Sequence, residues 1–462
     1  MRIAMFAPVR PQRSGIASYT AALLPWMARR HRIDLFTDET IETGHAPRGA
    51  AHVFNAHDIV WRHARDPYDL IVYHLGNSPV HDYMWPYLVR YAGLVVVHDG
   101  NLQAARGHYF LSRGDIEGYR AEFAYEDPRH AAAAELVIAG VSGTLRLQWP
   151  MLRSAVTTAR TVAVHNPWLA AQLRGRYPDA HIEAIRPGID DPLPEEDEAA
   201  RAAIRARHGL PSDAVVFGAF GWVTREKRVP QILRAMAGLA DKEPNAHLLL
   251  VGSTVDHYDV RADLRAAGLE DRVTVAGYVD DADMARYLCA TDVCLCLRWP
   301  TMRETSATWL RALAAGRATI ITDLAHNQDV PVLSAAACTR STPAAAGDPS
   351  PAPVAVAVDI CDEGRVLPAA MSALARDADL RRRLGSAARA YWAASFRMEH
   401  SAEDYERVMS AAAARPAGRP AVPPHLDDDG GRSARAILRP FDAMPNFLRR
   451  DGVDSRIHGV DA

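Results

Sequence analysis

The chain alternates short apolar runs with longer stretches in which apolar residues recur every three or four positions. Short apolar runs are typical of buried strands, and the longer periodic stretches are typical of helices. Because parallel strands need helical crossovers, this alternation predicts an α/β fold with parallel sheets. The apolar runs predict strands at residues 3–7, 33–36, 70–74, 94–99, 161–165, 182–185, 215–220, 247–251, 273–278, 293–297, 319–322 and 354–360.

A break in this pattern divides the chain in two. Pro187 and Gly188 are followed by an acidic, proline-containing stretch at 190–198, after which the alternation restarts. Such a composition is typical of a link between domains. We therefore predict two Rossmann-like parallel-sheet domains, residues 1–188 and 189–385, that face each other across a cleft.

The remaining segments differ in character. Helical periodicity continues to about residue 414, which predicts a helical element at 386–414. Residues 415–462 mix prolines, a triple aspartate and scattered arginines, as poorly ordered tails do, although 437–447 could dock as a short segment. Residues 334–353 are rich in Ala, Ser, Thr, Pro and Gly, which predicts a flexible loop.

The overall charge bears on the class of ligand. Lys and Arg total 53 against 56 Asp and Glu, giving a net charge of -3. This balance provides no general attraction to nucleic acid or to an anionic membrane, so we predict no nucleic-acid partner. Any anionic ligand must be held by local positive groups.

The cysteines and the N-terminus bear on the compartment. The five cysteines form no CxxC pair, and Cys294 and Cys296 alternate within an apolar run. This favours buried thiols in a reducing compartment over a metal or redox site. The first residues run directly into a predicted strand, and no apolar stretch approaches the roughly 20 residues of a membrane span. We predict a cytoplasmic protein and leave contact with the inner face of the membrane open.

Polar residues that follow predicted strands are the candidates for ligand binding, because parallel sheets bind ligands beyond the carboxyl ends of their strands. In the first half, Ser14 and Gly15 would open a helix whose free N–H groups suit a phosphate. His98 and Asp99 leave a strongly apolar strand, where His98 could contact a ligand's hydroxyls or diphosphate. An ordinary capped turn and a structural histidine are the alternatives.

A cationic cluster follows the first predicted strand of the second domain. Gly221 ends that strand, and Arg225, Lys227 and Arg228 stand at the start of the next helix, where cations oppose the helix dipole. A bound diphosphate would offset this cost, since Arg presents a planar fork and Lys a compact charge to phosphate oxygens. The alternative is a solvated charge run partly neutralised by Glu226.

A fourth group of polar residues again lies between a strand and a helix. Arg298 and Glu304 follow the strand, and Thr305 or Ser306 is a natural N-cap for the helix. Glu304 could serve only to compensate the helix dipole. Because it has no other local role after a buried strand, we predict that it contacts a ligand.

Cations and carboxylates on opposing rims suit a sugar joined to a nucleoside diphosphate. A dinucleotide cofactor fits less well, because no GxGxxG follows these strands. The sequence also lacks a Walker pattern, a His/Cys/Asp cluster with metal spacing and a GxSxG turn. We therefore predict neither a cofactor nor a bound metal.

On these residues, the chain resembles a bacterial retaining glycosyltransferase of family 4, which has the GT-B fold. The resemblance covers roughly residues 1–414 and is most specific at 218–323. Gly221 and Lys227 match the first Gly and the Lys of the family's Gly-Arg-Leu-x-x-x-Lys-Gly segment. The family's arginine position is Trp222 here, so the resemblance leaves Arg225 to supply the guanidinium.

The resemblance also implies roles for other residues. The family's glycine-containing loop is matched by Ser14 and Gly15. The family carries two glutamates separated by seven residues; the second, which holds the nucleotide ribose, is Arg311 here, and Glu304 takes the sugar-contacting role of the first through a one-residue shift. His98 matches the position near the sugar and β-phosphate.

The resemblance implies transfer of a glycosyl group from a nucleoside diphosphate sugar, with retention at the anomeric carbon and without a metal. It leaves the acceptor open as a glycan, a lipid or a small molecule, and suggests a role in cell-surface polysaccharide biosynthesis. It also implies that the C-terminal helices cross back onto the first domain. There are two alternative interpretations. The first is an inactive relative that binds a glycan or a partner, and Arg311 in place of the family's glutamate supports it. The second is another GT-B enzyme, such as a sugar-nucleotide epimerase.

Overall fold

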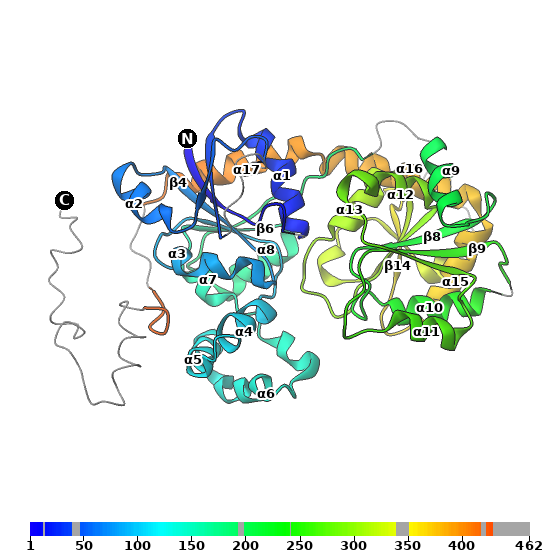
Figure 1. The fold of residues 1–462 in the computed structure, drawn as a ribbon, viewed down its shortest axis with the longest axis horizontal. Coiled ribbons are helices and arrows are strands. Elements are labelled where there is room, and N and C mark those ends of the chain that lie inside the picture. The colour runs from blue at the N-terminus through cyan, green and yellow to red at the C-terminus, as the bar shows by residue number, and fades with distance from the viewer. Residues whose placement is uncertain are drawn as a thin grey trace.

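The computed structural model describes residues 1–12, 14–38, 47–192, 198–240, 242–338, 351–416 and 422–427. In this part of the chain two parallel sheets, each of seven strands, form two Rossmann-like units side by side (Figure 1). The α/β class and the parallel pairing predicted from the apolar runs are confirmed. The predicted docking segment at 437–447 lies outside the described residues.

The first sheet has the strand order β3-β2-β1-β4-β5-β6-β7. Its strands are β1 (Arg2–Phe6), β2 (Arg32–Thr37), β3 (His52–Asn55), β4 (Leu70–Leu75), β5 (Leu94–Val97), β6 (Thr161–Val164) and β7 (Ile182–Ala184). The predicted strands match these within a few residues, except that β3 was not predicted. β3 lies at the sheet edge with both of its end residues exposed, so its sequence lacks an apolar run.

The second sheet has the order β10-β9-β8-β11-β12-β14-β13. Its strands are β8 (Val215–Phe220), β9 (Ala246–Val251), β10 (Val273–Gly277), β11 (Val293–Cys296), β12 (Ala318–Thr322), β13 (Val332–Ser334) and β14 (Ala355–Val358). Of these, β13 was not predicted, because it is a three-residue edge strand with exposed ends.

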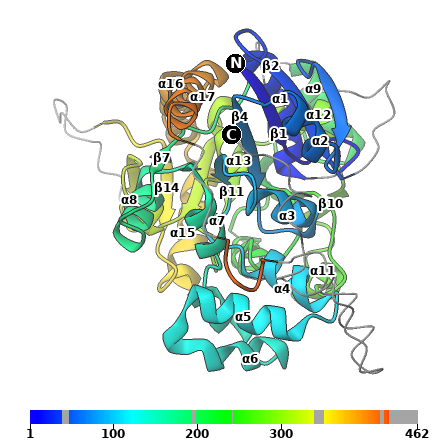
Figure 2. The same cartoon turned by 90° about the vertical axis from the view of Figure 1, so that its left-hand side faces the viewer.

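Helices cover both faces of each sheet. In the first unit they are α1 (Gly15–Met27), α2 (Asp58–Arg65), α3 (Trp85–Leu88), α4 (Gln103–Leu111), α5 (Ile116–Glu126), α6 (Ala134–Ile138), α7 (Arg153–Thr158) and α8 (Pro167–Arg176). The segment between β5 and β6 forms a helical lobe, α4 to α6, that projects away from the sheet (Figures 1 and 2).

The second unit and the C-terminal region contain nine further α-helices among the described residues. They are α9 (Glu198–Arg207), α10 (Val229–Leu239), α11 (Val260–Ala267), α12 (Asp281–Ala290), α13 (Ala307–Ala314), α14 (Ala335–Cys338), α15 (Glu363–Arg376), α16 (Ala378–Ser395) and α17 (Met398–Ala413). Helix α14 and the end of β13 occupy the start of the predicted flexible loop at 334–353. Most of that loop lies outside the described residues.

The C-terminal helices join the two units. Helix α16 packs on α13 of the second unit, whereas α17 packs on α1 of the first (Figure 1). Ser401 Oγ in α17 lies 2.9 Å from Tyr19 Oη in α1, and Asp404 accepts hydrogen bonds from Arg186. The C-terminal helices therefore contact both units.

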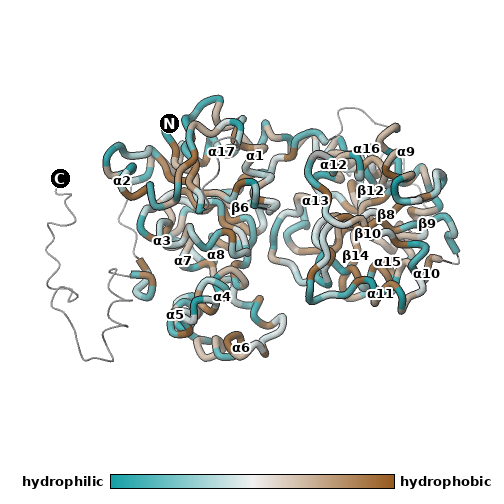
Figure 3. Tube along the Cα trace, in the orientation of Figure 1, coloured by the Kyte–Doolittle hydropathy of each residue, from teal (hydrophilic) through white to brown (hydrophobic). Residues whose placement is uncertain are grey.

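The apolar strands form the core of each unit. Hydropathy mapped on the chain places the most hydrophobic segments in the two sheets and the polar ones on the outer loops and helices (Figure 3). Strands β4, β5 and β6 are buried along their whole lengths, which brings the polar residues that follow them to one sheet edge. Within the described parts of the chain, every helix is too short or too polar to cross a membrane.

Candidate active site

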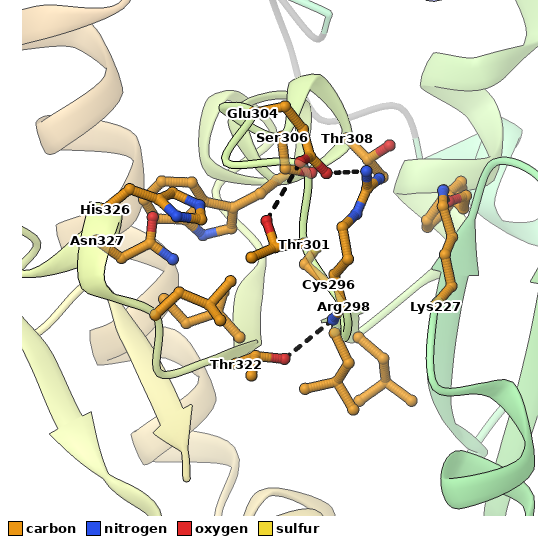
Figure 4. A pocket seen from close by; sticks show the side chains of 16 residues that line it. Lys227, Cys296, Arg298, Thr301, Glu304, Ser306, Thr308, Thr322, His326 and Asn327 are labelled. Atoms are coloured by element: carbon orange, nitrogen blue, oxygen red, sulfur yellow. Dashed lines mark hydrogen bonds and ion pairs between the residues drawn. The ribbon is translucent and has the colours of Figure 1, made fainter. Parts of the chain in front are cut away.

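A charged pocket opens at the carboxyl ends of β8, β11 and β12 (Figure 4). Its side chains come from three loops that follow these strands and from the start of α13. The lining residues are Phe220, Lys227, Leu295, Cys296, Leu297, Arg298, Thr301, Glu304, Ser306, Thr308, Trp309, Ile321, Thr322, Leu324, His326 and Asn327. We call this the charged pocket. It lies where open α/β sheets bind ligands.

A backbone hydrogen bond and a neighbouring glycine determine the position of Lys227 in the charged pocket. Its Nζ donates a hydrogen bond to the Phe220 carbonyl over 2.6 Å. Gly221 has φ +91, a conformation that favours glycine, and a Cβ there would lie 2.2 Å from Nζ and displace the lysine from this position. Burial, together with repulsion from Arg298, lowers the pKa of Lys227 to about 7. Among the described residues, the side-chain hydrogen bond of Lys227 goes to a backbone carbonyl and not to a carboxylate, so a bound anion would stabilise its ammonium form.

Arg298 and Glu304 form an ion pair inside the pocket. In Figure 4 the Arg298 guanidinium lies between Glu304 and Lys227. Thr301 Oγ1 donates to the second oxygen of Glu304 over 3.2 Å, and the Arg298 backbone N–H donates to Thr322 Oγ1 over 2.9 Å. Burial lowers the pKa of Arg298, as expected for a cation withdrawn from water. These bonds fix the carboxylate that the sequence predicted to contact a ligand.

The start of α13 adds backbone donors to the same pocket. Ser306 is the N-cap, since its Oγ accepts from the Trp309 N–H over 3.3 Å, which confirms the predicted capping role. Ser306 and Thr308 both line the pocket. A helix N-terminus with free N–H groups next to Lys227 and Arg298 is suited to phosphate oxygens.

Two cations of the predicted cluster lie outside this pocket. Arg225 is exposed, and its guanidinium lies 4.9 Å from the ring centroid of Tyr258. Arg228 forms an ion pair with Glu363, a buried carboxylate at the start of α15. Arg228 therefore links α10 to α15, and of the three cations in the predicted cluster Lys227 lines the charged pocket while Arg225 and Arg228 do not.

Across the cleft, Ser14 and Gly15 open α1 as predicted. Ser14 Oγ accepts from the N–H groups of Ile16 and Ala17 at 3.1 and 3.2 Å. No atom lies within 4 Å of a Cβ built on Gly15, so this helix start faces open space.

His98 lies in a row of three histidines at the carboxyl ends of β4, β5 and β6. Its Nε2 is 3.0 Å from His74 Nδ1, and its Nδ1 is 3.1 Å from His165 Nε2. His165 Nδ1 in turn faces the Ile185 carbonyl at 3.2 Å. Both ring nitrogens of His98 are therefore engaged within the first unit. His98 does not line the charged pocket.

The row is neutral and has one consistent set of tautomers. Burial lowers the pKa of His74 to about 3 and that of His165 to about 4, and burial with neighbouring histidines holds the pKa of His98 well below its usual range. A carbonyl only accepts, so His165 carries its proton on Nδ1. His98 then donates from Nδ1 to His165 and accepts at Nε2 from His74.

Arg311 lies in a second cavity, between the two units. This interdomain cavity is lined by Gly15, Ser18, Tyr19, Ala22, residues 188–192, Asp281, Met284, Ala285, Leu288, Ala307 and Arg311. Asp281 collects three donors there: Ser18 Oγ at 2.6 Å, Arg10 at 2.9 Å and Arg311 at 3.2 Å. Burial raises the pKa of Asp281, but these hydrogen bonds and charges outweigh it and lower the pKa overall.

The structure thus brings Lys227, Arg298, Glu304 and Ser306 together and places His98 and Arg311 in neighbouring sites. The sequence did not lead us to Asp281. This carboxylate follows the predicted strand at 273–278, so its place at the carboxyl end of a strand could have revealed it. Nor did the sequence lead us to Thr301, whose hydroxyl gives no local signal. The described residues contain no group of three or more His, Cys, Asp or Glu side chains arranged to hold a metal ion.

Comparison with known families and structures agrees with this geometry. Residues 212–338, which contain Lys227, Arg298 and Glu304, match the family described as glycosyl transferases group 1. One curated relative is mannosylfructose-phosphate synthase of Agrobacterium fabrum, 31% identical over 153 residues, or 31% of this chain and 32% of that one. Among the curated relatives that match, the aligned segments span from 32% to 49% of the relative's length.

Solved structures extend the likeness over the whole fold. Sucrose-phosphate synthase of Thermosynechococcus elongatus is similar with a TM-score of 0.59 and 19% identity, covering 89% of this chain and 100% of that one. HepE of Anabaena, solved with UDP and glucose, is similar with a TM-score of 0.59 and 14% identity over the same shares. The chain has the GT-B fold. Its second unit carries a glycosyl transferases group 1 segment, which supports a glycosyltransferase family.

Proposed function

We propose that this protein is a retaining glycosyltransferase of family 4 that uses a nucleoside diphosphate sugar as donor and needs no metal. The observation that carries the proposal is the charged pocket. There, the Lys227 ammonium, the Arg298 guanidinium and the start of α13 converge beside the Glu304 carboxylate.

The diphosphate of the donor would lie against Lys227, Arg298 and the N–H groups at the start of α13. Charge develops on the leaving diphosphate as its bond to the anomeric carbon breaks, and fixed cations in a buried pocket stabilise that charge strongly. This arrangement would supply the electrostatic role that a metal ion plays in other enzymes. The acceptor hydroxyl oxygen would form the new bond to the anomeric carbon on the face that the diphosphate leaves, and its proton would pass to the oxygen of the departing diphosphate.

The sugar would lie on the Glu304 side of the same pocket. A carboxylate accepts hydrogen bonds from sugar hydroxyls, and Glu304 is already oriented by Arg298 and Thr301. A mobile sugar ring would be held in a reactive position by these bonds.

The nucleoside would extend from the diphosphate into the interdomain cavity. Arg311 and Asp281 meet there, close to Gly15 at the start of α1. The carboxylate that the resemblance expects at residue 311 would be supplied by Asp281, which suggests that Arg311 does not abolish nucleotide binding.

A UDP-sugar is the first donor to test, because HepE, a structural neighbour, was solved with UDP and glucose. The acceptor would enter from the side of the first unit, where the start of α1 lines the interdomain cavity. The proposal keeps three acceptor classes: a glycan, a lipid and a small molecule. It also includes a cytoplasmic location with peripheral membrane contact and a role in polysaccharide biosynthesis.

The test is a panel of UDP-, GDP- and ADP-sugars incubated with the full chain. Thermal shift identifies the nucleotide, since a ligand selective for the folded state raises Tm. Release of nucleoside diphosphate from the selected sugar, followed by ¹H NMR of the anomeric proton, reports transfer and its stereochemistry. We expect release with an α-configured product from an α-linked donor. Binding without release under any acceptor mixture would favour the inactive relative, and interconversion of the donor sugar would favour an epimerase.

A further inference from the structure

The two residues that follow β6, His165 and Asn166, contact functional elements of both units. The His165 side chain bonds to His98 in the first unit, as described above. The His165 carbonyl accepts from Thr305 Oγ1 of the second unit over 3.1 Å, and Asn166 Nδ2 donates to the Arg303 carbonyl over 3.2 Å.

These contacts reach the segment that holds Glu304 on both of its sides. Arg303 and Thr305 are the neighbours of Glu304 in the chain, and each is bonded to the first unit. Arg303 has φ +61, a left-handed conformation that a non-glycine residue adopts at a cost unless its surroundings hold it. The bond from Asn166 to the Arg303 carbonyl is one such restraint.

The first unit is shaped to receive this segment. A Cβ built on Gly100 would lie 3.0 Å from Arg303 Cβ and 2.9 Å from a methyl group of Leu169. Gly100 thus leaves the space into which Arg303 packs. Asn166 is itself fixed, because its Oδ1 accepts from the Leu169 N–H over 2.7 Å as the N-cap of α8.

We infer that His165 and Asn166 are positioning residues that couple closure of the two units to the orientation of both His98 and Glu304. When the units meet, Asn166 and the His165 carbonyl fix the segment around Glu304, while the His165 ring holds His98. When the units part, these bonds to the second unit are lost, and the two chain neighbours of Glu304 lose the restraints on the Arg303 carbonyl and the Thr305 hydroxyl. The predicted effect on kcat rests on the proposed transferase function, whereas the predicted effect on the structure does not.

The structural consequence can be tested without any substrate. Asn166→Asp keeps an oxygen that caps α8 but replaces the donor to Arg303 with an acceptor that faces a carbonyl. We expect a larger radius of gyration by small-angle scattering of the full chain. We also expect about three- to tenfold faster hydrogen exchange at residues 303–305, the size of one lost hydrogen bond.

The matched control changes a cap away from the cleft. Asp259 caps α11 by accepting from the Ala262 N–H over 3.0 Å, and Asp259→Ser should leave the radius of gyration and exchange at 303–305 as in the wild type. If Asn166→Asp also leaves both quantities unchanged while α8 remains folded, the coupling is overturned, whatever activity the protein proves to have.

The kinetic consequence separates the two residues. His165→Phe removes the ring bond to His98 but keeps the carbonyl, so kcat should fall about three- to tenfold with a wild-type radius of gyration. Asn166→Asp should lower kcat by a similar factor with the larger radius, and neither variant should change donor KM by more than about twofold. An increase in donor KM with unchanged kcat would contradict a positioning role for either residue.

Discussion

The two rims of the cleft differ in how their polar groups are satisfied. On the second unit, Lys227 and Arg298 are cations withdrawn from water; Lys227 donates to a backbone carbonyl, whereas Arg298 is paired with Glu304. On the first unit, His98 is neutral and both of its ring nitrogens are hydrogen-bonded to other histidines. A rim that carries a buried cation is suited to bind an anion, whereas a rim built on hydrogen bonds between neutral side chains is suited to hold a shape. We therefore assign donor recognition to the second unit and positioning to the first.

The largest effect should come from removing the charge on the second rim. Lys227→Ala should weaken binding of the nucleoside diphosphate by about 10- to 150-fold, because a hydrogen bond to a charged group contributes roughly 1.5–3 kcal/mol. Isothermal titration calorimetry measures this directly. Arg225→Ala serves as the matched control: Arg225 packs on Tyr258 outside the charged pocket, so its loss should change affinity by less than about threefold. Equal losses in the two variants would remove the distinction between pocket and surface cations.

Glu304 should affect turnover more than binding. Glu304→Gln keeps the side-chain shape but removes the charge that Arg298 and Thr301 orient, so kcat should fall about 10- to 100-fold while affinity for the nucleoside diphosphate stays within about threefold. Steady-state kinetics and calorimetry on the same variant separate the two quantities. If kcat is unchanged, Glu304 does not contact the sugar.

The pH dependence of binding should report Lys227. Its pKa is lowered to about 7 in the free protein, and a diphosphate binds the protonated form. Above pH 7 the free protein loses this proton while the complex keeps it, so affinity should fall by up to about tenfold per pH unit between pH 7 and 9. Calorimetry in buffers of different ionisation enthalpy should show proton uptake on binding. Lys227→Met should bind weakly and lose most of this slope; an unchanged slope would assign the proton to another group.

The smallest effect should come from the neutral rim. His98→Ala removes two neutral hydrogen bonds and should lower kcat about three- to tenfold, with little change in nucleoside diphosphate affinity. A parallel measurement of Tm separates loss of function from loss of fold. A wild-type kcat would make His98 a structural residue of the first sheet.

Much of this fold could be predicted from the sequence, because its strands are buried apolar runs. The apolar runs at 94–97 and 215–220 each predict a central strand. The polar residues that follow these runs indicate the sheet edge where ligands bind. Strands β3 and β13 were missed because edge strands with exposed ends need no apolar run.

The partners of the site residues could not be predicted in the same way. Arg228 pairs with Glu363, which lies 135 residues away, and His98 pairs with His165, which lies 67 residues away. Local composition shows that a cation or a histidine follows a strand, but only the tertiary fold decides whether a carboxylate neutralises it. The same limit applies to Arg311, whose partner Asp281 comes from a different helix.

The central claim is that the second unit binds the donor diphosphate through the charged pocket. A crystal structure of the full chain with the nucleoside diphosphate selected by thermal shift tests it most directly. We predict the β-phosphate within hydrogen-bonding distance of Lys227 Nζ and of the first N–H groups of α13. A diphosphate bound instead on the histidine row of the first unit, with the charged pocket empty, would contradict the account.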